Sequence, residues 1–379
     1  MEPGELQALR ESVRAFCDAH VRPTVRERDR AESFPDRLLP GLAEIGVLGA
    51  VIPEAYGGSG LDDAGYRVVI EELGAADSSL RSLVSVNLGL VGTSILRWGT
   101  DAQRSRWLPG LARGELGAFG LTEAAAGSNP SQLQSRAVRG PDGWTLDGTK
   151  IFITNGSLGA VTMIFARAIV DGEDRGITCY LVPQDAPGYT GTQIHGKLGL
   201  RSGDTAELVL GGVVVGEDAV LGEVGGGMKV ALSALDAGRF SLAAGAVGLA
   251  REALEVSLRY AAEREQWGGP IAGKQLVQEL LAGMHVDIQA ASGLVDAVVA
   301  KRLAGQRSTL EASTAKLFAT EASVRCADRA VQVHGGYGYI DEYPVQRLLR
   351  DARVTTLYEG TSQVQHLIIG RLLTGENAF

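Results

Sequence analysis

A short stretch near the C-terminus, Tyr358-Glu359-Gly360-Thr361, places one acidic side chain between an aromatic residue and a glycine. It precedes a predicted helix that Thr361 or Ser362 would cap. A carboxylate beside an aromatic ring and bare backbone can become a general base of raised pKa once a ligand excludes water. A glutamate near a helix start is more often a solvated partner of the helix dipole, and these residues alone favour that second interpretation.

A second candidate site begins at Phe119-Gly120-Leu121-Thr122-Glu123 and continues through the small residues 124–129. Small residues let backbone amides approach a ligand, and Thr122 and Ser128 add hydroxyl groups. In residues 151–155 an aromatic side chain and a threonine alternate on one face of a predicted strand, which suits a flat heterocycle. An ordinary glycine-rich loop and an ordinary β-core produce the same patterns, so spacing alone leaves both interpretations open.

Several familiar motifs are absent from the sequence. Gly148-Thr149-Lys150 is not followed by Ser or Thr, so there is no Walker A loop. No Gly-x-Gly-x-x-Gly lies at a predicted strand-to-helix turn, and no Gly-x-Ser-x-Gly occurs, which argues against a Rossmann site and a hydrolase elbow. The five histidines and the three cysteines show no metal-ligand spacing, so we expect no metal.

Composition limits the class of protein. The 379 residues are 45% hydrophobic, enough for two or three domains with substantial cores. The formal net charge of −9 argues against a nucleic-acid partner. We expect no apolar run long enough to span a bilayer, and the acidic start lacks the layout of a signal peptide. Three widely separated cysteines fit reduced thiols, so we expect a soluble, cytoplasmic protein.

Hydrophobic periodicity predicts three successive regions. Helical spacing dominates the first region, at residues 6–51, 63–73 and 81–98, with a shorter helix around 107–114. Short β-branched segments separated by Gly or Asp then predict antiparallel strands, at residues 144–148, 151–154, 161–166, 177–182 and 206–210. Long Ala- and Gly-rich helices follow, at residues 228–265, 273–304 and 308–333, before the final helix. We expect an N-terminal helical domain (1–117), a middle β domain (118–227) and a C-terminal helical bundle (228–379).

Five motifs spread over almost the whole chain resemble the acyl-CoA dehydrogenase family. They are Leu121-Thr122-Glu123 with Ala126-Gly127-Ser128, Gly148 to Asn155, Glu263 to Gly268, Gln332 to Gly336, and Tyr358 to Thr361. The resemblance implies an α+β multidomain fold with an N-terminal helical domain, a middle antiparallel β-barrel domain and a C-terminal four-helix bundle. It also implies FAD as cofactor, bound without a Rossmann motif, and α,β-dehydrogenation of a short acyl thioester on coenzyme A or a carrier protein.

The resemblance gives each matching residue a role. Glu359 would abstract the α-proton while the β-hydrogen leaves as hydride to flavin N5, and the Glu359 amide would be one donor to the thioester oxygen. Thr122 and Thr154 would hydrogen-bond the flavin ring, with Phe152 packed against it. The other expected cofactor-binding residues, several of them serving the FAD of a neighbouring subunit, are Phe119, Leu121, Gly127, Ser128, Arg264, Gln266, Trp267, Gln275, Gln332, Gly335, Gly336, Thr361 and Gln363.

The resemblance also implies which residues bind substrate: Arg81, Ser82, Ser85, Ser128, Asp236, Arg239, Gly360 and Phe379. A narrower resemblance, to glutaryl-CoA dehydrogenases, lies in residues 79–85, 127–131 and 374–379. In that branch Arg81, Ser82 and Ser85 would meet a distal carboxylate of the acyl chain, because an arginine in an apolar segment needs an anion. An internal ion pair satisfies the same need. The string around Arg81 also resembles dehydrogenases of carrier-bound acyl groups.

Two departures and two competing functions complete the interpretation. The acidic residue that glutaryl-CoA dehydrogenases place seven positions before Arg81 is Gly74, which puts decarboxylation in doubt. Some branches take the base from the helix at 236–239, where the equivalent residue is Gly238, leaving Glu359 as the base. A flavin monooxygenase or oxidase and a non-catalytic binding protein are the alternatives, and Glu359 argues against both. The resemblance further implies a homotetramer (a dimer of dimers), or at least a homodimer, and electron-transferring flavoprotein as partner.

Overall fold

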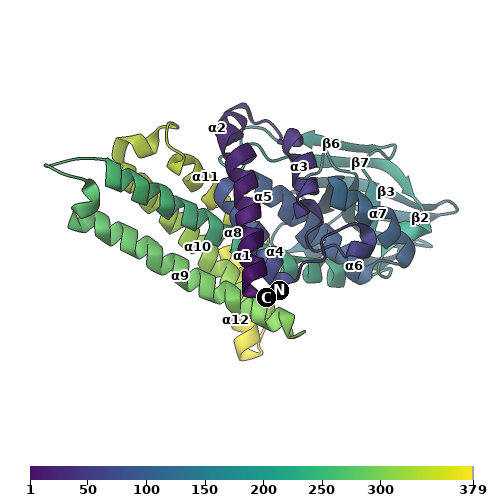
Figure 1. Ribbon diagram of the computed structural model, residues 1–379. Coiled ribbons are helices and arrows are strands. Elements are labelled where there is room, and N and C mark those ends of the chain that lie inside the picture. Colours follow the sequence, from purple (N-terminus) through teal and green to yellow (C-terminus); the bar gives the residue numbers. More distant parts are fainter. Residues whose placement is uncertain (378–379) are drawn as a thin grey trace.

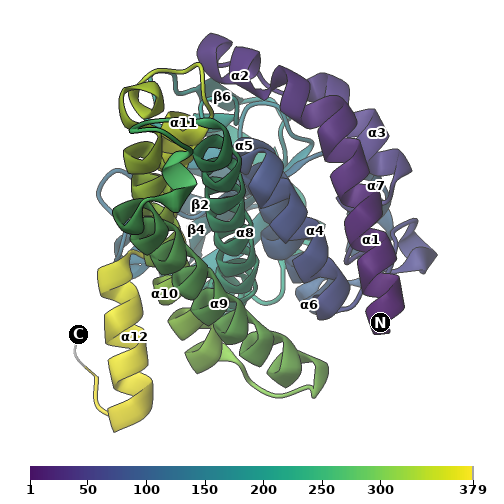
Figure 2. The ribbon, with the colours of Figure 1, turned by 60° about the vertical axis from the view of Figure 1, so that its left-hand side comes forward.

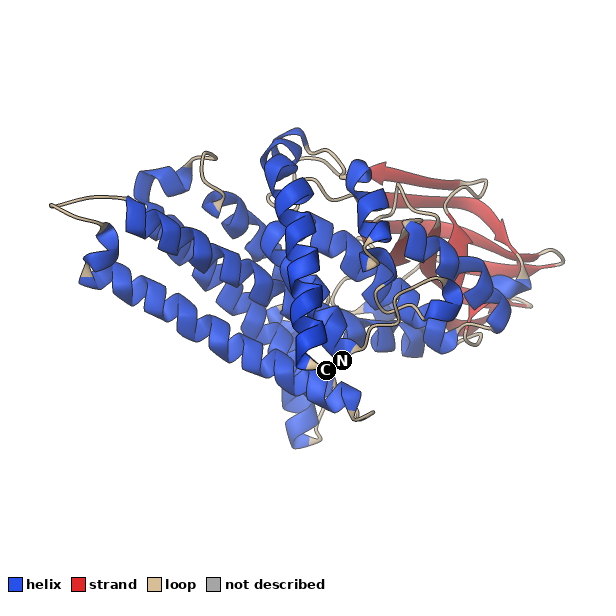
Figure 3. Ribbon diagram, viewed as in Figure 1, coloured by secondary structure: helices blue, strands red, loops and turns tan. Residues whose placement is uncertain are grey.

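The computed structural model describes residues 1–377 and consists of three regions that follow one another along the chain (Figure 1). Figure 3 shows the strands gathered at one end of the molecule and the longest helices at the other. The order helices, sheet, helices agrees with the order predicted from the sequence.

The N-terminal region is helical, as predicted. Its helices are α1 (Pro3–Phe16), the π-helix η1 (Cys17–Val21), α2 (Arg22–Ala31), α3 (Leu39–Glu44), α4 (Asp63–Ala76), α5 (Ser78–Val84), the π-helix η5 (Ser85–Gly92), α6 (Thr93–Trp98) and α7 (Asp101–Arg113). Polar side chains begin two of them. The Asp62 carboxylate accepts the Gly65 amide at the start of α4, and Thr100 and Gln103 form a capping box on α7.

The middle region is one eight-stranded sheet in the order β6-β7-β3-β2-β4-β5-β8, with β1 paired to β4. The strands are β1 (Gly117–Gly120), β2 (Arg136–Gly140), β3 (Gly143–Thr154), β4 (Val161–Val170), β5 (Glu173–Pro183), β6 (Tyr189–Gln193), β7 (Thr205–Val215) and β8 (Val220–Leu221). The expectation of antiparallel strands was wrong for two pairs, because β1–β4 and β2–β4 are parallel. Strand β2 lies between β3 and β4. It pairs antiparallel with β3 and parallel with β4.

Strand β3 also corrects a boundary. The segments 144–148 and 151–154, predicted as separate strands, form one strand that pairs with β7. The register of this pairing shifts between Leu146 and Gly148 and again between Lys150 and Ile153. Such bulges turn a strand and redirect its side chains, so the sequence interruption near Gly148 reflects a bend.

The C-terminal region contains five helices, α8 (Gly227–Glu263), α9 (Gln275–Leu303), α10 (Thr309–His334), α11 (Val345–Thr355) and α12 (Ser362–Thr374). Helix α10 packs against α8, α9, α11 and α12, and α4 of the N-terminal region packs against α8 (Figure 2). The sequence analysis did not predict α11. Its buried residues Val345, Leu348 and Ala352 are outnumbered by charged ones, so its apolar stripe is narrow.

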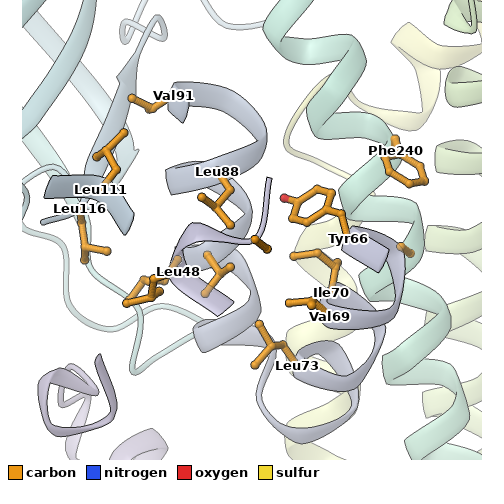
Figure 4. Close-up of a cluster of buried hydrophobic side chains, with 14 of the residues drawn as sticks. Leu48, Tyr66, Val69, Ile70, Leu73, Leu88, Val91, Leu111, Leu116 and Phe240 are labelled. Atoms are coloured by element: carbon orange, nitrogen blue, oxygen red, sulfur yellow. The ribbon is translucent and has the colours of Figure 1, made fainter. Parts of the chain in front are cut away.

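Two helical segments overturn the expectation that no run could span a bilayer. Ser78–Trp98 and Gly227–Glu263 are long and apolar enough by length and composition, but 89% and 72% of their most apolar windows are buried inside the protein. Core helices pass the same test. Figure 4 shows part of the core around the first segment, in which Leu88 and Val91 belong to the same buried cluster as Tyr66, Ile70 and Leu73 of α4 and Phe240 of α8.

Glycines let α4 and α8 approach at backbone distance. A Cβ added to Gly74 would lie 2.4 Å from the Gly245 carbonyl oxygen, and one added to Gly248 would lie 2.0 Å from the Glu71 carbonyl oxygen. Neither backbone oxygen can move aside as a flexible side chain can. The departure at Gly74 therefore has a packing cause, because an acidic side chain does not fit there.

Gly248→Ala is expected to destabilise the protein by about 1–3 kcal/mol through overpacking. The matched control is Gly293→Ala on α9, where an added Cβ meets no described atom within 4 Å and a helical alanine gains up to about 1 kcal/mol. The midpoints of thermal unfolding measure both effects. Equal midpoints for the two variants would contradict the close approach of α4 and α8.

Candidate active site

Glu359 lies in the turn between α11 and α12 and has a left-handed backbone, with φ +54°, followed by Gly360 at φ +91°. The Thr361 hydroxyl accepts the Val364 amide at 3.3 Å, so Thr361 is the N-cap of α12, one of the two residues that the sequence offered for this role. A non-glycine residue in this conformation is uncommon and persists where its surroundings hold it. The turn is therefore a strained element that presents the Glu359 side chain.

Glu359 is half-buried, and one oxygen of its carboxylate, the buried Oε2, has no hydrogen-bond partner among residues 1–377. Burial raises the pKa of Glu359 to about 7, against the opposing charges of Arg81, Lys316 and Arg239. An acid with this pKa near neutral pH, surrounded by cations, has the properties of a general base.

Gly238 on α8 leaves room for this carboxylate. A Cβ at position 238 would lie 2.4 Å from Glu359 Oε2 and 2.7 Å from Leu90 Cδ2. Gly238 is the position from which some branches of the family take their base, and it lies directly beside Glu359. Any larger residue at 238 must displace the Glu359 side chain.

Arg81 is almost completely buried, with 2% of its surface exposed, and makes one side-chain hydrogen bond, from Nη2 to the Tyr358 hydroxyl at 2.6 Å. In the described part of the chain, Arg81 Nη1 has no hydrogen-bond partner, and the Tyr66 hydroxyl lies close enough for the Arg81 charge to act on it. Ser82 is buried, and the Ser85 hydroxyl is bonded to Ser241 of α8. Within the described residues Arg81 thus forms no salt bridge, and its charge acts on Glu359 through space.

Asp236 and Arg239 form an ion pair on one turn of α8, with 2.7 Å between Oδ1 and Nη1. Asp236 Oδ2 also accepts the Thr309 hydroxyl at 2.8 Å. Burial lowers the pKa of Arg239, and the charges of Asp236 and Glu359 oppose this effect. Arg239 is therefore the second arginine that the fold directs toward Glu359.

The residues expected to bind the flavin lie on two connected segments of the sheet. Leu121 and Thr122 follow β1, and the Thr122 carbonyl accepts the Ile151 amide of β3 at 3.0 Å. Phe152 has φ +62° at the bulge of β3, and its ring is 65% exposed. Thr154 ends β3, Phe119 packs on Phe165, and Gly127 and Ser128 are exposed in the loop.

A buried ion pair fixes the first of these segments. Lys150 Nζ donates to Glu123 Oε1 at 2.7 Å and to the Phe165 carbonyl at 2.6 Å. The Glu123 carboxylate also accepts the amides of Gln134 and Ser135, so it ties both ends of the loop together. Burial lowers the pKa of Lys150 to about 8, and Glu123 opposes that effect.

A second group of expected cofactor residues gathers in a pocket on the C-terminal helices. Arg264, Gln266, Gly335 and Gly336 line a cavity of about 410 Å³, together with His334 and aromatic residues. The His334 ring stacks on Tyr260 with 4.2 Å between ring centres. The remaining expected residues do not line the cavity: Trp267 lies in the segment between α8 and α9, Gln275 begins α9, Gln332 lies on α10, and Thr361 and Gln363 lie at the start of α12. Phe379 lies outside the described residues.

Sequence reasoning missed three residues of the Glu359 surroundings, Tyr66, Lys316 and Gln365. Lys316 Nζ donates to the Gly360 carbonyl at 2.8 Å, and Gln365 Nε2 donates to the same oxygen at 2.9 Å. Lys316 lies in a helix whose buried neighbours are alanines. A lysine among small buried residues was the available signal, because burial of an ammonium requires a partner.

Three family models match the chain: the N-terminal domain of acyl-CoA dehydrogenase over residues 3–115, the middle domain over 118–213 and the C-terminal domain over 225–374. The chain therefore belongs to the acyl-CoA dehydrogenase family. Its three-domain fold is confirmed by this match. Members of the family are FAD-dependent oxidoreductases that act on CH–CH bonds, which confirms the predicted enzyme class and cofactor.

Individual relatives span nearly the full chain. An acyl-CoA dehydrogenase from Bacillus subtilis (strain 168) is 38% identical over 368 residues, which cover 97% of each protein. Butyryl-CoA dehydrogenase from Megasphaera elsdenii has a TM-score of 0.93 at 38% identity and covers 97% of each chain. Glutaryl-CoA dehydrogenase from Mycobacterium smegmatis in complex with FADH2 has a TM-score of 0.95 at 36% identity and covers 100% of this chain and 96% of that one. The glutaryl-CoA branch remains a prediction.

Gly238→Ala is expected to slow substrate-dependent flavin reduction by up to about 100-fold, because the new Cβ displaces the flexible end of Glu359 by about an ångström. The fold should tolerate this change, since a side chain rather than backbone must move. Gly370→Ala on α12, where an added Cβ meets no described atom within 4 Å, is the control. Stopped-flow absorbance measures the rate, and equal rates for the two variants would show that position 238 does not confine the carboxylate.

Proposed function

We propose that this chain catalyses α,β-dehydrogenation of a short acyl thioester with Glu359 as the base. The observation that carries the proposal is the half-buried Glu359 carboxylate, whose buried Oε2 has no partner in the described structure and whose pKa is raised to about 7 by desolvation. A base with this pKa is substantially ionised at neutral pH and still accepts a proton effectively. The charges of Arg81, Lys316 and Arg239 favour its ionised form.

The thioester must be activated before a carboxylate can remove its α-proton. Donors placed where negative charge develops on the thioester oxygen supply that activation. The Glu359 amide donates no hydrogen bond within the described residues, so it is available for this task. The carbonyl oxygens of Glu359 and Gly360 are held by Gln365, which fixes the direction of the peptide groups around that amide.

The residues present fit FAD. The outward-facing Phe152 ring, with Thr122 and Thr154 on the same sheet, offers an aromatic surface and hydroxyl groups for a flavin ring. The cavity containing Arg264 and the stacked His334 offers a cation and aromatic surfaces, which suit a diphosphate and a base. When bound, FAD accepts the hydride that leaves the β-carbon. We infer that the cavity residues serve the FAD of a neighbouring subunit.

We infer that the acyl chain carries a distal anion. Arg81 is buried and forms no salt bridge in the part of the chain described, and its Nη1 has no hydrogen-bond partner there. A buried guanidinium of this kind is stabilised by an anionic ligand. Coenzyme A and a carrier protein remain alternative carriers, and the names of relatives include both butyryl-CoA and glutaryl-CoA dehydrogenases.

Glu359→Gln is expected to lower the rate of flavin bleaching by acyl thioester about 10²–10⁴-fold, because glutamine cannot accept the α-proton. In the wild type, kcat/KM should fall as pH drops below about 7, since protonation of Glu359 removes the base. Anaerobic stopped-flow over pH 5.5–9 checks both results. Bleaching that survives the substitution would remove the assigned base, and rapid reoxidation by oxygen with hydroxylated product would favour a monooxygenase.

Arg81→Met is expected to lower kcat/KM for glutaryl-CoA by at least about 30-fold more than for butyryl-CoA, because a buried charge pair with the distal carboxylate is lost. Mass spectrometry of the products from both thioesters, and from their carrier-protein forms, measures this selectivity and reveals any decarboxylation. Equal losses on the two substrates would assign Arg81 a structural role.

We further propose a cytoplasmic homotetramer that passes electrons to electron-transferring flavoprotein. Large apolar side chains on and near the C-terminal helices are exposed in the single chain, Trp267 and Tyr339 each by 87%, which supports association of subunits. Light scattering of the FAD-loaded protein should give four times the monomer mass. A monomer with full FAD occupancy would contradict shared cofactor sites.

A further inference from the structure

The turn that presents Glu359 needs a specific restraint. Two consecutive residues, Glu359 and Gly360, have positive φ angles, and such a turn persists only when its surroundings determine it. Two fully buried side chains supply donors to its carbonyl groups. Lys316 Nζ lies 2.8 Å and Gln365 Nε2 lies 2.9 Å from the Gly360 oxygen, and Gln365 also reaches the Glu359 oxygen at 3.2 Å.

Lys316 is an unusual member of this pair because its ammonium has no ion-pair partner within the described chain. Burial lowers the pKa of Lys316 to about 8, and the charge of Glu359 is the main effect opposing it, ahead of Glu321. A buried ammonium without a nearby negative charge is costly. Lys316 and Glu359 therefore stabilise each other's charge through space, while the ammonium bonds to backbone.

The other charged and titratable groups that face Glu359 do not bond to the Gly360 carbonyl. Arg81 from α5 is bonded to Tyr358, and Arg239 from α8 is paired with Asp236. Tyr66 from α4 is uncharged at neutral pH, because burial raises its pKa. Among the cations of this group in the described chain, Lys316 from α10 is the one whose hydrogen bond goes to the backbone of the turn that carries Glu359.

We propose that Lys316 is a positioning residue, which anchors the Gly360 carbonyl and holds a positive charge near the Glu359 carboxylate without bonding to it. The inference rests on the proposed role of Glu359 as base. A cation hydrogen-bonded to the carboxylate would compete with the substrate proton. Anchored one residue away, the same cation favours the ionised base and leaves Oε2 free to accept the α-proton.

Lys316→Met removes the charge and the anchor together. We expect the pH midpoint of kcat/KM to rise by about one unit, because a nearby opposite charge shifts a carboxyl pKa by that amount or more. At pH values above the midpoint, kcat should fall about tenfold or more through misplacement of Glu359. KM should change less than kcat, since Lys316 contacts the turn only through the Gly360 carbonyl and has no hydrogen bond to Arg81, Ser82 or Ser85 among the described residues.

Three further variants separate charge from anchoring. Lys316→Arg keeps the charge and should retain the wild-type midpoint with a reduced kcat. Gln365→Met removes an anchor without a charge and should also lower kcat at an unchanged midpoint. Lys301→Met, which removes a half-exposed lysine paired with Glu311 on the bundle surface, should change neither.

The pH profiles of flavin reduction for all four variants decide the matter. An unchanged midpoint in Lys316→Met, or an equal shift in Lys316→Arg, would overturn the proposal. If Lys316→Met fails to fold or to retain FAD, the other two variants test the proposal. A pH midpoint in Gln365→Met or Lys316→Arg that differs from the wild-type midpoint overturns the proposal. Unchanged midpoints with reduced kcat support it. Flavin reduction in Glu359→Gln would instead remove the base itself, so the two failures are distinguishable.

Discussion

The structure depends on the Glu359 carboxylate, which is half-buried, ionisable near neutral pH and has one buried oxygen without a hydrogen-bond partner in the described chain. In water a glutamate needs no help to ionise, but it is a weak base and its lone pairs are occupied. Burial makes Glu359 more basic, and the same burial would leave it protonated if no cations were near. The surroundings of Glu359 therefore combine desolvation with positive charge while leaving Oε2 unbonded.

Helix α8 meets several of these requirements at once. Gly238 leaves space for the carboxylate, and Arg239 adds a charge beside it. Further along the helix, Gly245 packs against the Arg81 side chain, where an added Cβ would lie 2.6 Å from Cδ. Close packing of α4 and α8 thus brings Arg81 into the site and excludes an acidic residue at Gly74 that could neutralise it.

Much of the fold could be predicted because its elements are long and periodic. Helices α8, α9 and α10 and the run α5–η5–α6 bury continuous apolar faces, and their predicted bounds agree closely with the structure. The parallel pairing of β2 with β4 could not be predicted, since strand order depends on contacts between distant segments. Helix α11 was missed because three arginines and an aspartate interrupt its apolar spacing.

The site, too, contains residues that the sequence could predict and residues that it could not. Glu359 stands in a distinctive local motif, so resemblance alone selected it. Lys316 and Gln365 have no such motif, and their contacts with the Gly360 carbonyl arise only when α10 and α12 pack. Ser85 was expected at the substrate, yet its hydroxyl is bonded to Ser241, a contact that local sequence cannot reveal.

The most direct test of the central claim is a crystal structure of the FAD-loaded protein with a non-oxidisable acyl thioester analogue bound. We expect a Glu359 carboxylate oxygen about 3–3.5 Å from the α-carbon, the separation of a reactive encounter. A Glu359 side chain turned away from the α-carbon, or another acid or base at that distance, would contradict the assignment of Glu359 as the catalytic base.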